Sequence, residues 1–347
     1  MPFEDIALFD NHAHPWLHVA DEPFARYFGE APFAQPDSLF YRSALRDLAA
    51  FLGCDVAEVE TARQTSDYAR RLVRDANISN VLLDDGYPRA GAYSVAECAA
   101  QGGFAAHRVL RLERVVEDLL LECDSLAQLE AALLRQLEAA RPGIVALKSI
   151  IAYRAGLAID PPDRAAAETG LKPGRLTHKP LLDYLFHVAA RFAADTALPL
   201  HLHSGFGDRD LDLRLANPLH LRPLFEAGLI GTHTPLVLLH TSYPYVREAA
   251  YLASVYPRVY VDLSEASPLL AGGGLTHVLE ELLALAPVTR LLYGSDAWGI
   301  PDWLWLAARS TRRALAEALA WLPESESTWT AERILRDNAA ELYQPFR

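Results

Sequence analysis

Residues 198–205 read Leu-Pro-Leu-His-Leu-His-Ser-Gly, and this stretch has the pattern of a buried strand that ends in histidine. The leucines predict a strand over 198–202, and His203 follows it directly. Because side chains two positions apart share one face of a strand, His201 and His203 point the same way, with His201 deeper. We therefore expect His203 to be presented at the carboxyl end of the strand and His201 to pack behind it.

Short apolar runs of this kind occur eight times along the chain. They cover 6–9, 81–83, 109–112, 144–147, 198–202, 236–239, 259–263 and 291–293. Longer stretches separate them, and helices are predicted over 115–140, 181–195 and 303–321. Buried runs that alternate with helices are typical of parallel strands with crossover connections. Eight such units predict an α/β fold, the closed (β/α)8 or TIM barrel.

Two stretches depart from this alternation. Residues 15–76 contain aromatic, proline and alanine-rich segments, and we predict a helical insertion there, after the first strand and over the active-site mouth. Residues 160–180 contain four prolines and two glycines, which predicts a long loop after the fourth strand. Long loops on that side of a barrel usually carry function. We expect residues 1–347 to form a single domain.

The composition restricts the class of function. The 347 residues include 32 lysines and arginines against 45 aspartates and glutamates, a net charge of −13, which argues against a nucleic-acid binder. With 51% hydrophobic residues the chain is globular. Three cysteines without a close pair indicate reduced thiols, and no targeting or membrane-spanning stretch is found. We expect a cytoplasmic protein with a small-molecule substrate and no nucleic-acid or membrane partner; barrels of this kind often form homodimers.

Polar residues follow five of the predicted strands at their carboxyl ends, where TIM-barrel active sites form. They are His12 and His14 after the first strand, Lys148 after the fourth, His203 after the fifth, His240 after the sixth and Asp296 after the eighth. Taken alone, the histidine pair could be two surface residues in a loop. Four histidines and an aspartate at one end of a barrel instead predict a divalent metal site, best suited to zinc, with manganese, iron or nickel as alternatives.

Lys148 is the unexpected member of this set, because an ammonium group beside a bound cation is repelled by it. Three states remain open for this side chain. It could be a neutral amine with a depressed pKa, a carbamate formed with carbon dioxide, or a lysine that simply extends to solvent from the strand end.

The motifs HAHP, LKS, HLHSG, LLHTS and YGSDA, on strands one, four, five, six and eight, resemble those of the amidohydrolase superfamily. The longer segments KSIIAYRAGL, HSGFGDRDLDL, NPLHLRPL and SYPYVREAAYLASVYPRVYVDLS resemble the amidohydrolase-2 type domain. That domain is found alone in bacteria and fused ahead of glutamine-synthetase-like domains in nodulin-like and fungal developmental proteins. The resemblance covers most of residues 6–345 and is weakest over 20–75.

The resemblance implies two alternative metal sites. In the two-metal form, His12 and His14 hold one ion with Asp296, His203 and His240 hold a second, and a carboxylated Lys148 bridges them. In the single-metal form, His12, His14, His203 and Asp296 hold one ion and His240 acts as acid or base.

A metal centre of this kind predicts hydrolysis of an amide or ester bond in a small carboxylate-bearing substrate by a metal-activated water. Asp296 would act as general base and then as general acid. The alternatives are a single-metal decarboxylase or lactonase that uses His240, and a non-catalytic sensing barrel that keeps its metal for stability.

Candidate substrate contacts lie on the loops after strands four, five and six. Arg154 and Arg247 could clamp a carboxylate, Asp208 could bind an amino group, and Tyr243 lies in the segment before Arg247. Each has an ordinary alternative, a surface ion pair for the arginines and a turn residue for Asp208.

Overall fold

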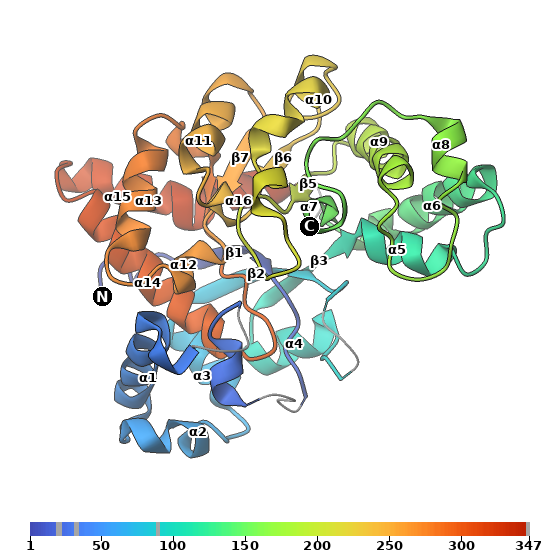
Figure 1. Cartoon of the computed structure of the whole chain (residues 1–347). Coiled ribbons are helices and arrows are strands. Elements are labelled where there is room, and N and C mark those ends of the chain that lie inside the picture. The colour runs from blue at the N-terminus through green and yellow to red at the C-terminus, as the bar shows by residue number, and fades with distance from the viewer. Residues whose placement is uncertain (19–22, 31–34, 88–90, 345–347) are drawn as a thin grey trace. The chain divides into compact units, whose positions relative to one another are not determined.

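The computed structural model describes residues 1–18, 23–30, 35–87 and 91–344 (Figure 1). The chain contains two compact units. The first comprises residues 1–107, 263–281 and 292–340, and the second comprises 108–262, 282–291 and 341–347. The prediction of a single domain therefore stays a prediction.

Eight strands follow one another in the sheet in chain order. They are β1 (Leu8–Ala13), β2 (Ile78–Asp84), β3 (Ala105–Arg111), β4 (Ala146–Ser149), β5 (Leu200–Leu202), β6 (Leu236–Leu238), β7 (Val259–Asp262) and β8 (Leu291–Leu292). The β1–β2 pair and the pairs from β3 to β7 are parallel. This is the strand order of a (β/α)8 barrel and confirms the predicted fold.

The first strand lies further along the chain than predicted. The sequence predicted 6–9, whereas β1 runs from Leu8 to Ala13 and all six of its residues are buried. Ala13 still pairs with Leu83 of β2, so His12 lies inside the strand. Polar residues of a strand are harder to recognise as buried than apolar ones, because their burial depends on hydrogen-bond partners elsewhere in the chain.

The part of the predicted insertion over 15–76 that the structure describes is mostly helical. It contains η1 (Phe24–Tyr27), η2 (Gln35–Asp37), α1 (Leu39–Leu52), η3 (Val56–Glu58), α2 (Val59–Ala62) and α3 (Tyr68–Asp75), with the α-helices in blue in Figure 1. Ser38 caps the start of α1 and Gly53, at φ 70°, ends it. The α3 helix packs on α14 (Asp302–Ala318) in the same unit. Parts of the stretch lie outside the described residues, and its place over the active-site mouth stays a prediction.

The first unit also contains the helices that follow β2, β7 and β8. They are α4 (Val95–Gly102), α12 (Ala266–Leu269), α15 (Glu324–Glu332) and α16 (Asn338–Tyr343), together with a π-helical turn over Arg333–Asp337 and most of α13 (Gly274–Leu283). The α16 helix extends into the second unit at its end. The helix predicted over 303–321 is confirmed as α14.

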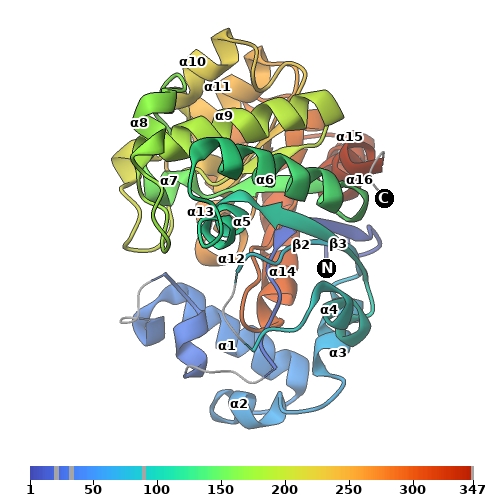
Figure 2. The same cartoon turned by 90° about the vertical axis from the view of Figure 1, so that its right-hand side faces the viewer.

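The second unit contains α5 (Leu112–Leu119), α6 (Leu126–Ala140), α7 (Ile151–Arg154), α8 (Arg164–Glu168), α9 (Lys179–Thr196), α10 (Arg222–Glu226) and α11 (Val246–Val255). Figure 2 shows α6, α8 and α9 packed side by side. The single helix predicted over 115–140 is wrong, because Ser125 caps a new helix by accepting a hydrogen bond from the backbone N–H of Gln128. The loop predicted over 160–180 contains α8, capped by Asp163.

All three cysteines, Cys54, Cys98 and Cys123, are free thiols in the structure. Burial raises the pKa of the Cys98 thiol to about 12, which keeps it protonated. Across the residues that the structure describes, every helix is too short or too polar to cross a membrane.

Candidate metal centre

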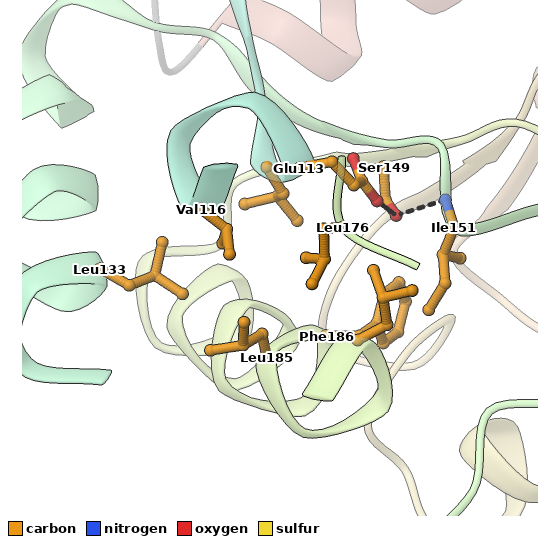
Figure 3. Close-up of a pocket in the computed structure, with 10 residues that line it drawn as sticks. Glu113, Val116, Leu133, Ser149, Ile151, Leu176, Leu185 and Phe186 are labelled. Atoms are coloured by element: carbon orange, nitrogen blue, oxygen red, sulfur yellow. Dashed lines mark hydrogen bonds between the residues drawn. The ribbon is translucent and has the colours of Figure 1, made fainter. Parts of the chain in front are cut away.

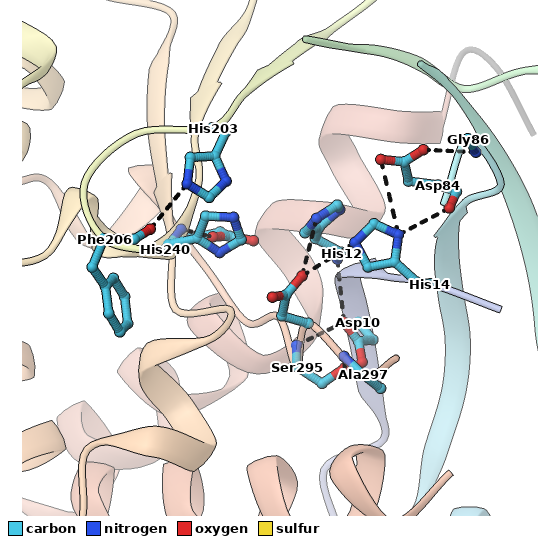
Figure 4. Close-up of polar contacts among 12 residues, drawn as sticks. Asp10, His12, His14, Asp84, Gly86, His203, Phe206, His240, Ser295 and Ala297 are labelled. Carbon is cyan, nitrogen blue, oxygen red and sulfur yellow. Dashed lines mark hydrogen bonds and ion pairs between the residues drawn. The ribbon is translucent and has the colours of Figure 1, made fainter. Parts of the chain in front are cut away.

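Three side chains of metal-ligand type converge in the first unit, and we call them the first cluster. Oδ1 of Asp296 lies 3.2 Å from Nε2 of His12 and 3.5 Å from Nε2 of His14 (Figure 4). The two imidazole rings meet edge to face, with centroids 4.9 Å apart. Both histidines are buried, and the Asp296 side chain is 15% exposed. One carboxylate oxygen thus faces two imidazole nitrogens.

The orientation of His14 is set by the end of β2. Its Nδ1 atom lies 3.0 Å from the backbone carbonyl oxygen of Asp84, so the neutral ring carries its proton on Nδ1 and donates it there. The lone pair is then on Nε2, the atom that faces Asp296. Asp84 is itself fixed, since its Oδ1 accepts a hydrogen bond from the backbone N–H of Gly86 at 3.0 Å. Asp84 therefore holds His14 in the tautomer that a metal requires.

A second buried acid, Asp10, links the chain segments that carry the first cluster. Its Oδ1 accepts hydrogen bonds from the backbone N–H of His12 at 3.2 Å and from that of Ser295 at 3.0 Å. The backbone N–H of Asp296 donates to the carbonyl oxygen of His12 at 2.8 Å. These bonds fix the backbone of His12 and Asp296 relative to each other, and the backbone N–H of His14 donates to the carbonyl oxygen of Ala297 at 2.6 Å.

The first cluster fits a divalent cation. Oδ1 of Asp296 is buried and has no hydrogen-bond partner among the described residues, although two nitrogen atoms lie within 3.5 Å of it. Its backbone adopts φ 56°, a left-handed conformation that a non-glycine residue takes only where the surroundings impose it. Two imidazoles and one carboxylate are ligands that zinc and neighbouring divalent metals accept.

His203 and His240, in the second unit, form the second cluster. Their ring centroids lie 4.4 Å apart (Figure 4). Nε2 of His203 donates to the carbonyl oxygen of Phe206 at 2.9 Å, which leaves Nδ1 as the ligand atom. The ring of Tyr153 packs on His203 with centroids 4.5 Å apart. Both histidines are buried.

The second cluster stands on two turns that pack against each other. His240, Thr241 and Ser242 have consecutive φ values of 62°, 54° and 52°, all in the left-handed region. Gly205, at φ 78°, lies so close to the Ser242 carbonyl group that a side-chain carbon at this position would overlap it. The Ser204 and Ser242 hydroxyls are hydrogen-bonded at 2.7 Å. The backbone next to both histidines is therefore left-handed, and the packing of the two turns against each other stabilises it.

Lys148 is buried in β4, with 1% of its surface exposed, so it does not extend to solvent. In the parallel register it lies between Arg111 of β3 and His201 of β5. Register partners in a sheet share a face, so these three side chains leave the sheet on the same side.

Arg154 is the candidate substrate residue with the most distinctive surroundings. Its Nη2 atom lies 3.1 Å from Oε1 of Glu117. Nε and Nη1 are buried and have no acceptor in the part of the chain that the structure describes. Burial lowers the pKa of this guanidinium, while Glu117 opposes the change. A buried arginine with unused donors is suited to bind an anion.

The other three candidates for substrate binding lie nearer the surface. Asp208 is exposed, and its Oδ1 accepts a hydrogen bond from the backbone N–H of Asp210 at 2.8 Å, as in a turn. Arg247 is exposed on α11. Tyr243 is half-buried, with its ring 5.2 Å from that of Phe206. A substrate role for these residues stays a prediction.

Sequence reasoning overlooked two acids that position the clusters. Asp10 begins the Asp-Asn-His-Ala-His motif, and Asp262, the last residue of β7, accepts a hydrogen bond from the backbone N–H of His240 at 2.8 Å. Asp262 ends β7, and Asp10 directly follows the apolar run 6–9, so the sequence offered a signal for both. His201 packs as expected, with Nε2 2.7 Å from the hydroxyl oxygen of Tyr343.

Comparison with known proteins identifies the family. The family model described as amidohydrolase matches residues 9–344, nearly the whole chain. The chain belongs to the amidohydrolase family. The crystal structure of a proposed metal-dependent hydrolase from Lactobacillus casei ATCC 334 has the same fold. Its sequence is 31% identical to that of this chain. The TM-score is 0.89, and the match covers 99% of this chain and 96% of the other.

More distant relatives extend the comparison. The chain is 29% identical to the protein fluG of Emericella nidulans, and the match covers 97% of this chain but 45% of that protein. The chain thus spans about half the length of this curated relative. Uronate isomerase from Thermotoga maritima has the same fold, with a TM-score of 0.65 at 13% identity over 98% and 95% of the two chains. Together, these findings show the TIM-barrel fold and the amidohydrolase family of this chain.

Proposed function

We propose that this protein is a metal-dependent hydrolase that cleaves an amide or ester bond in a small carboxylate-bearing substrate. The observation that carries the proposal is the first cluster, in which a buried Asp296 oxygen without a hydrogen bond faces Nε2 of His12 and of His14. The family match and the hydrolase relative at 31% identity support it.

The first cluster would hold one divalent cation, most suitably zinc. His203 and His240 would hold a second through Nδ1 of His203, with Lys148 as a carbamate supplying an anionic ligand in the same unit. A divalent cation bound at such ligands lowers the pKa of water toward neutrality and polarises a carbonyl group.

The side chains then have distinct tasks. Asp296 accepts the proton of the attacking water on its carboxylate and returns it to the leaving group, as general base and then general acid. The His14 ring stays fixed because its Nδ1–H donates to the Asp84 carbonyl oxygen, and Asp10 holds the backbone N–H of His12. Arg154 binds the substrate carboxylate through the donors that the described residues leave unused.

Metal content per chain and intact mass under non-denaturing conditions test the proposal. We expect two divalent ions and the added mass of one carbon dioxide, which should disappear in Lys148→Met. A screen of amides and esters of small carboxylic acids should then reveal turnover that a chelator abolishes. His277→Ala is the matched control for histidine removal, since His277 is an exposed residue that pairs with Glu280 at the surface.

Other outcomes would redirect the assignment. One ion with an unmodified Lys148 would favour a single-metal decarboxylase or lactonase in which His240 is the acid or base. Tight metal binding with no turnover in the screen would favour a sensing barrel. No bound metal after purification in metal-containing buffer would overturn the proposal.

A further inference from the structure

A buried glutamate lies at the start of α5, next to the end of β4. Glu113 is 4% exposed, and its neighbours Leu112 and Val116 on the same helix are also buried. It borders a cavity of about 20 Å³ whose other walls are mostly leucine, valine, isoleucine and phenylalanine side chains (Figure 3). Burial in these apolar surroundings raises the pKa of Glu113, which means that the charged carboxylate is destabilised here.

The Glu113 carboxylate makes two short contacts with the chain after β4. Oε1 accepts a hydrogen bond from the Ser149 hydroxyl at 2.6 Å, and Oε2 accepts one from the backbone N–H of Ile150 at 3.0 Å (Figure 3). The Ser149 hydroxyl oxygen in turn accepts a hydrogen bond from the backbone N–H of Ile151 at 3.2 Å. One carboxylate thus fixes the whole turn between β4 and α7.

This turn joins the two functional candidates of the β4 region. Lys148 immediately precedes Ser149, and Arg154 ends α7 after the turn. Glu117, one helical turn after Glu113 on α5, forms the ion pair with Arg154. Two acids on one face of α5 therefore hold both ends of the segment that carries Lys148 and Arg154.

An apolar residue would suit this environment better than an acid, because burying a carboxylate costs free energy that its hydrogen bonds only partly return. We propose that Glu113 is a positioning residue that sets Lys148 for metal binding and Arg154 for substrate binding through the turn at Ser149 and Ile150. The inference rests on the roles given above to Lys148 and Arg154.

The test compares Glu113→Gln with wild type. Glutamine has the same shape, but its amide group offers a donor where Ile150 or Ser149 needs an acceptor, so the turn loses one bond. We expect the affinity for zinc, measured by competition with a chromogenic chelator, to fall about 10- to 100-fold. Hydrogen exchange at the Ile150 amide should accelerate in the same protein. Glu138→Gln, at an exposed acid that pairs with Arg141, should change neither quantity.

Ser149→Ala removes the hydroxyl that donates to Glu113 and should also lower the affinity for zinc. This second variant keeps the test possible if Glu113→Gln does not fold. A purely structural role predicts a lower melting temperature with unchanged zinc affinity in the folded protein, and that result would overturn the inference.

Lys148→Met separates this inference from the proposed function. If Lys148→Met loses zinc affinity while both Glu113→Gln and Ser149→Ala retain it, the positioning role of Glu113 is wrong and the proposed function stands. If Lys148→Met binds zinc as wild type does, the ligand role of Lys148 fails, and the inference fails with it.

Discussion

Asp296 combines three properties that rarely occur together in one residue. Its backbone is left-handed at φ 56°, its side chain is largely buried, and one of its oxygens faces two imidazoles without a hydrogen bond. Each of these costs free energy in a protein without a ligand, and residues of this kind concentrate at functional sites. Asp296 therefore has the features of a functional residue rather than of a structural one.

Replacing Asp296 by asparagine should keep the shape and remove the base. We expect kcat to fall by about 10²- to 10⁴-fold, the range of general acid–base catalysis, with cooperative unfolding retained. Turnover of the best substrate from the screen and thermal melts check this. Asp118→Asn, in an exposed pair with Arg114, is the control and should match wild type. A kcat within twofold of wild type for Asp296→Asn would rule out the role given to this carboxylate.

Arg154 provides a test of substrate charge. Lysine keeps the positive charge of Arg154 but loses the planar fork, so Arg154→Lys should raise KM for a carboxylate substrate about tenfold, a loss near 1.4 kcal/mol. Steady-state kinetics on the acid and on its uncharged amide analogue measure this, and the analogue should show no difference. Arg141→Lys, at an exposed surface pair, is the matched control. Equal KM increases for both substrates would show that Arg154 does not recognise the charge of the substrate.

The candidate ligand side chains could be selected from the sequence because each follows an apolar run, a pattern that the sequence displays directly. The groups that orient them could not all be found in this way. His14 is held by the backbone carbonyl of Asp84, and Asp10 binds the backbone N–H of Ser295, far along the chain. Contacts to backbone atoms leave little trace in residue identity, so the sequence shows that acids stand at these positions but not which backbone groups they bind.

At the scale of elements, the two turns under His203 and His240 are the most constrained feature. Gly205 and Gly272 both have left-handed backbone, at φ 78° and 62°, but the space around Gly272 is open. An alanine at either position costs about 1–2 kcal/mol for the backbone alone. At Gly205 the added carbon also overlaps the Ser242 carbonyl group.

Gly205→Ala should therefore destabilise the protein by about 1–3 kcal/mol more than Gly272→Ala, the usual range for overpacking. Urea unfolding of both variants gives this difference, and zinc binding should weaken only in Gly205→Ala. Equal loss of stability in the two variants would mean that the packing of the turns is not what holds the second cluster.

The α9 helix contains a histidine that should make stability depend on pH. Burial lowers the pKa of His187 below 6.5, although Asp183 and the bond to the Asp160 carbonyl oppose the shift. The unfolded chain then binds a proton at a higher pH than the folded one. The stability that neutral His187 contributes is therefore present above pH 6.5 and lost as the pH falls toward the folded pKa.

We expect His187→Gln, which stays neutral and can still donate to Asp160, to remove this part of the pH dependence. Urea unfolding from pH 8 to pH 5 measures the unfolding free energy of both proteins. That of wild type should fall relative to that of the variant as the pH decreases. A difference that stays constant with pH would show that His187 titrates alike in both states.

The elements themselves were largely predictable, because apolar runs mark buried strands whatever surrounds them. The failures have local causes. The break after α5 was missed although Ser125 is a normal helix cap. The extension of β1 to Ala13 was missed because Asp10, Asn11 and His12 are polar, and their burial depends on partners elsewhere in the chain, such as Ser295 for Asp10.

At the scale of the whole molecule, the alternation of strands and helices was enough to predict the TIM barrel, and the family match confirms this fold class. The division into two compact units could not be predicted, because it depends on the density of contacts between distant segments. A metal ion bound at either cluster should raise the free energy of unfolding of the whole chain, because a ligand that binds only the folded state stabilises it.

Removing metal should therefore lower the melting temperature of the entire protein. Zinc restored at about 100 times its dissociation constant should contribute about 2.7 kcal/mol to the free energy of unfolding for each site. Calorimetry of chelated and zinc-loaded protein measures the effect. His12→Asn should reduce it, whereas His277→Asn, at an exposed histidine, should not. Identical melting curves with and without zinc would exclude tight binding to the folded state.

The left-handed residues His240, Thr241, Ser242 and Asp296 also have a consequence for how fast a metal is exchanged. Their conformational cost, about 1–3 kcal/mol for each residue, is met when the chain folds. An arriving ion then finds ligands already in place, and its capture is limited by how quickly it sheds its own water. Release, in contrast, would require several rigidly held ligands to break their contacts with the ion. A protein built in this way acquires its ion readily and retains it for a long time.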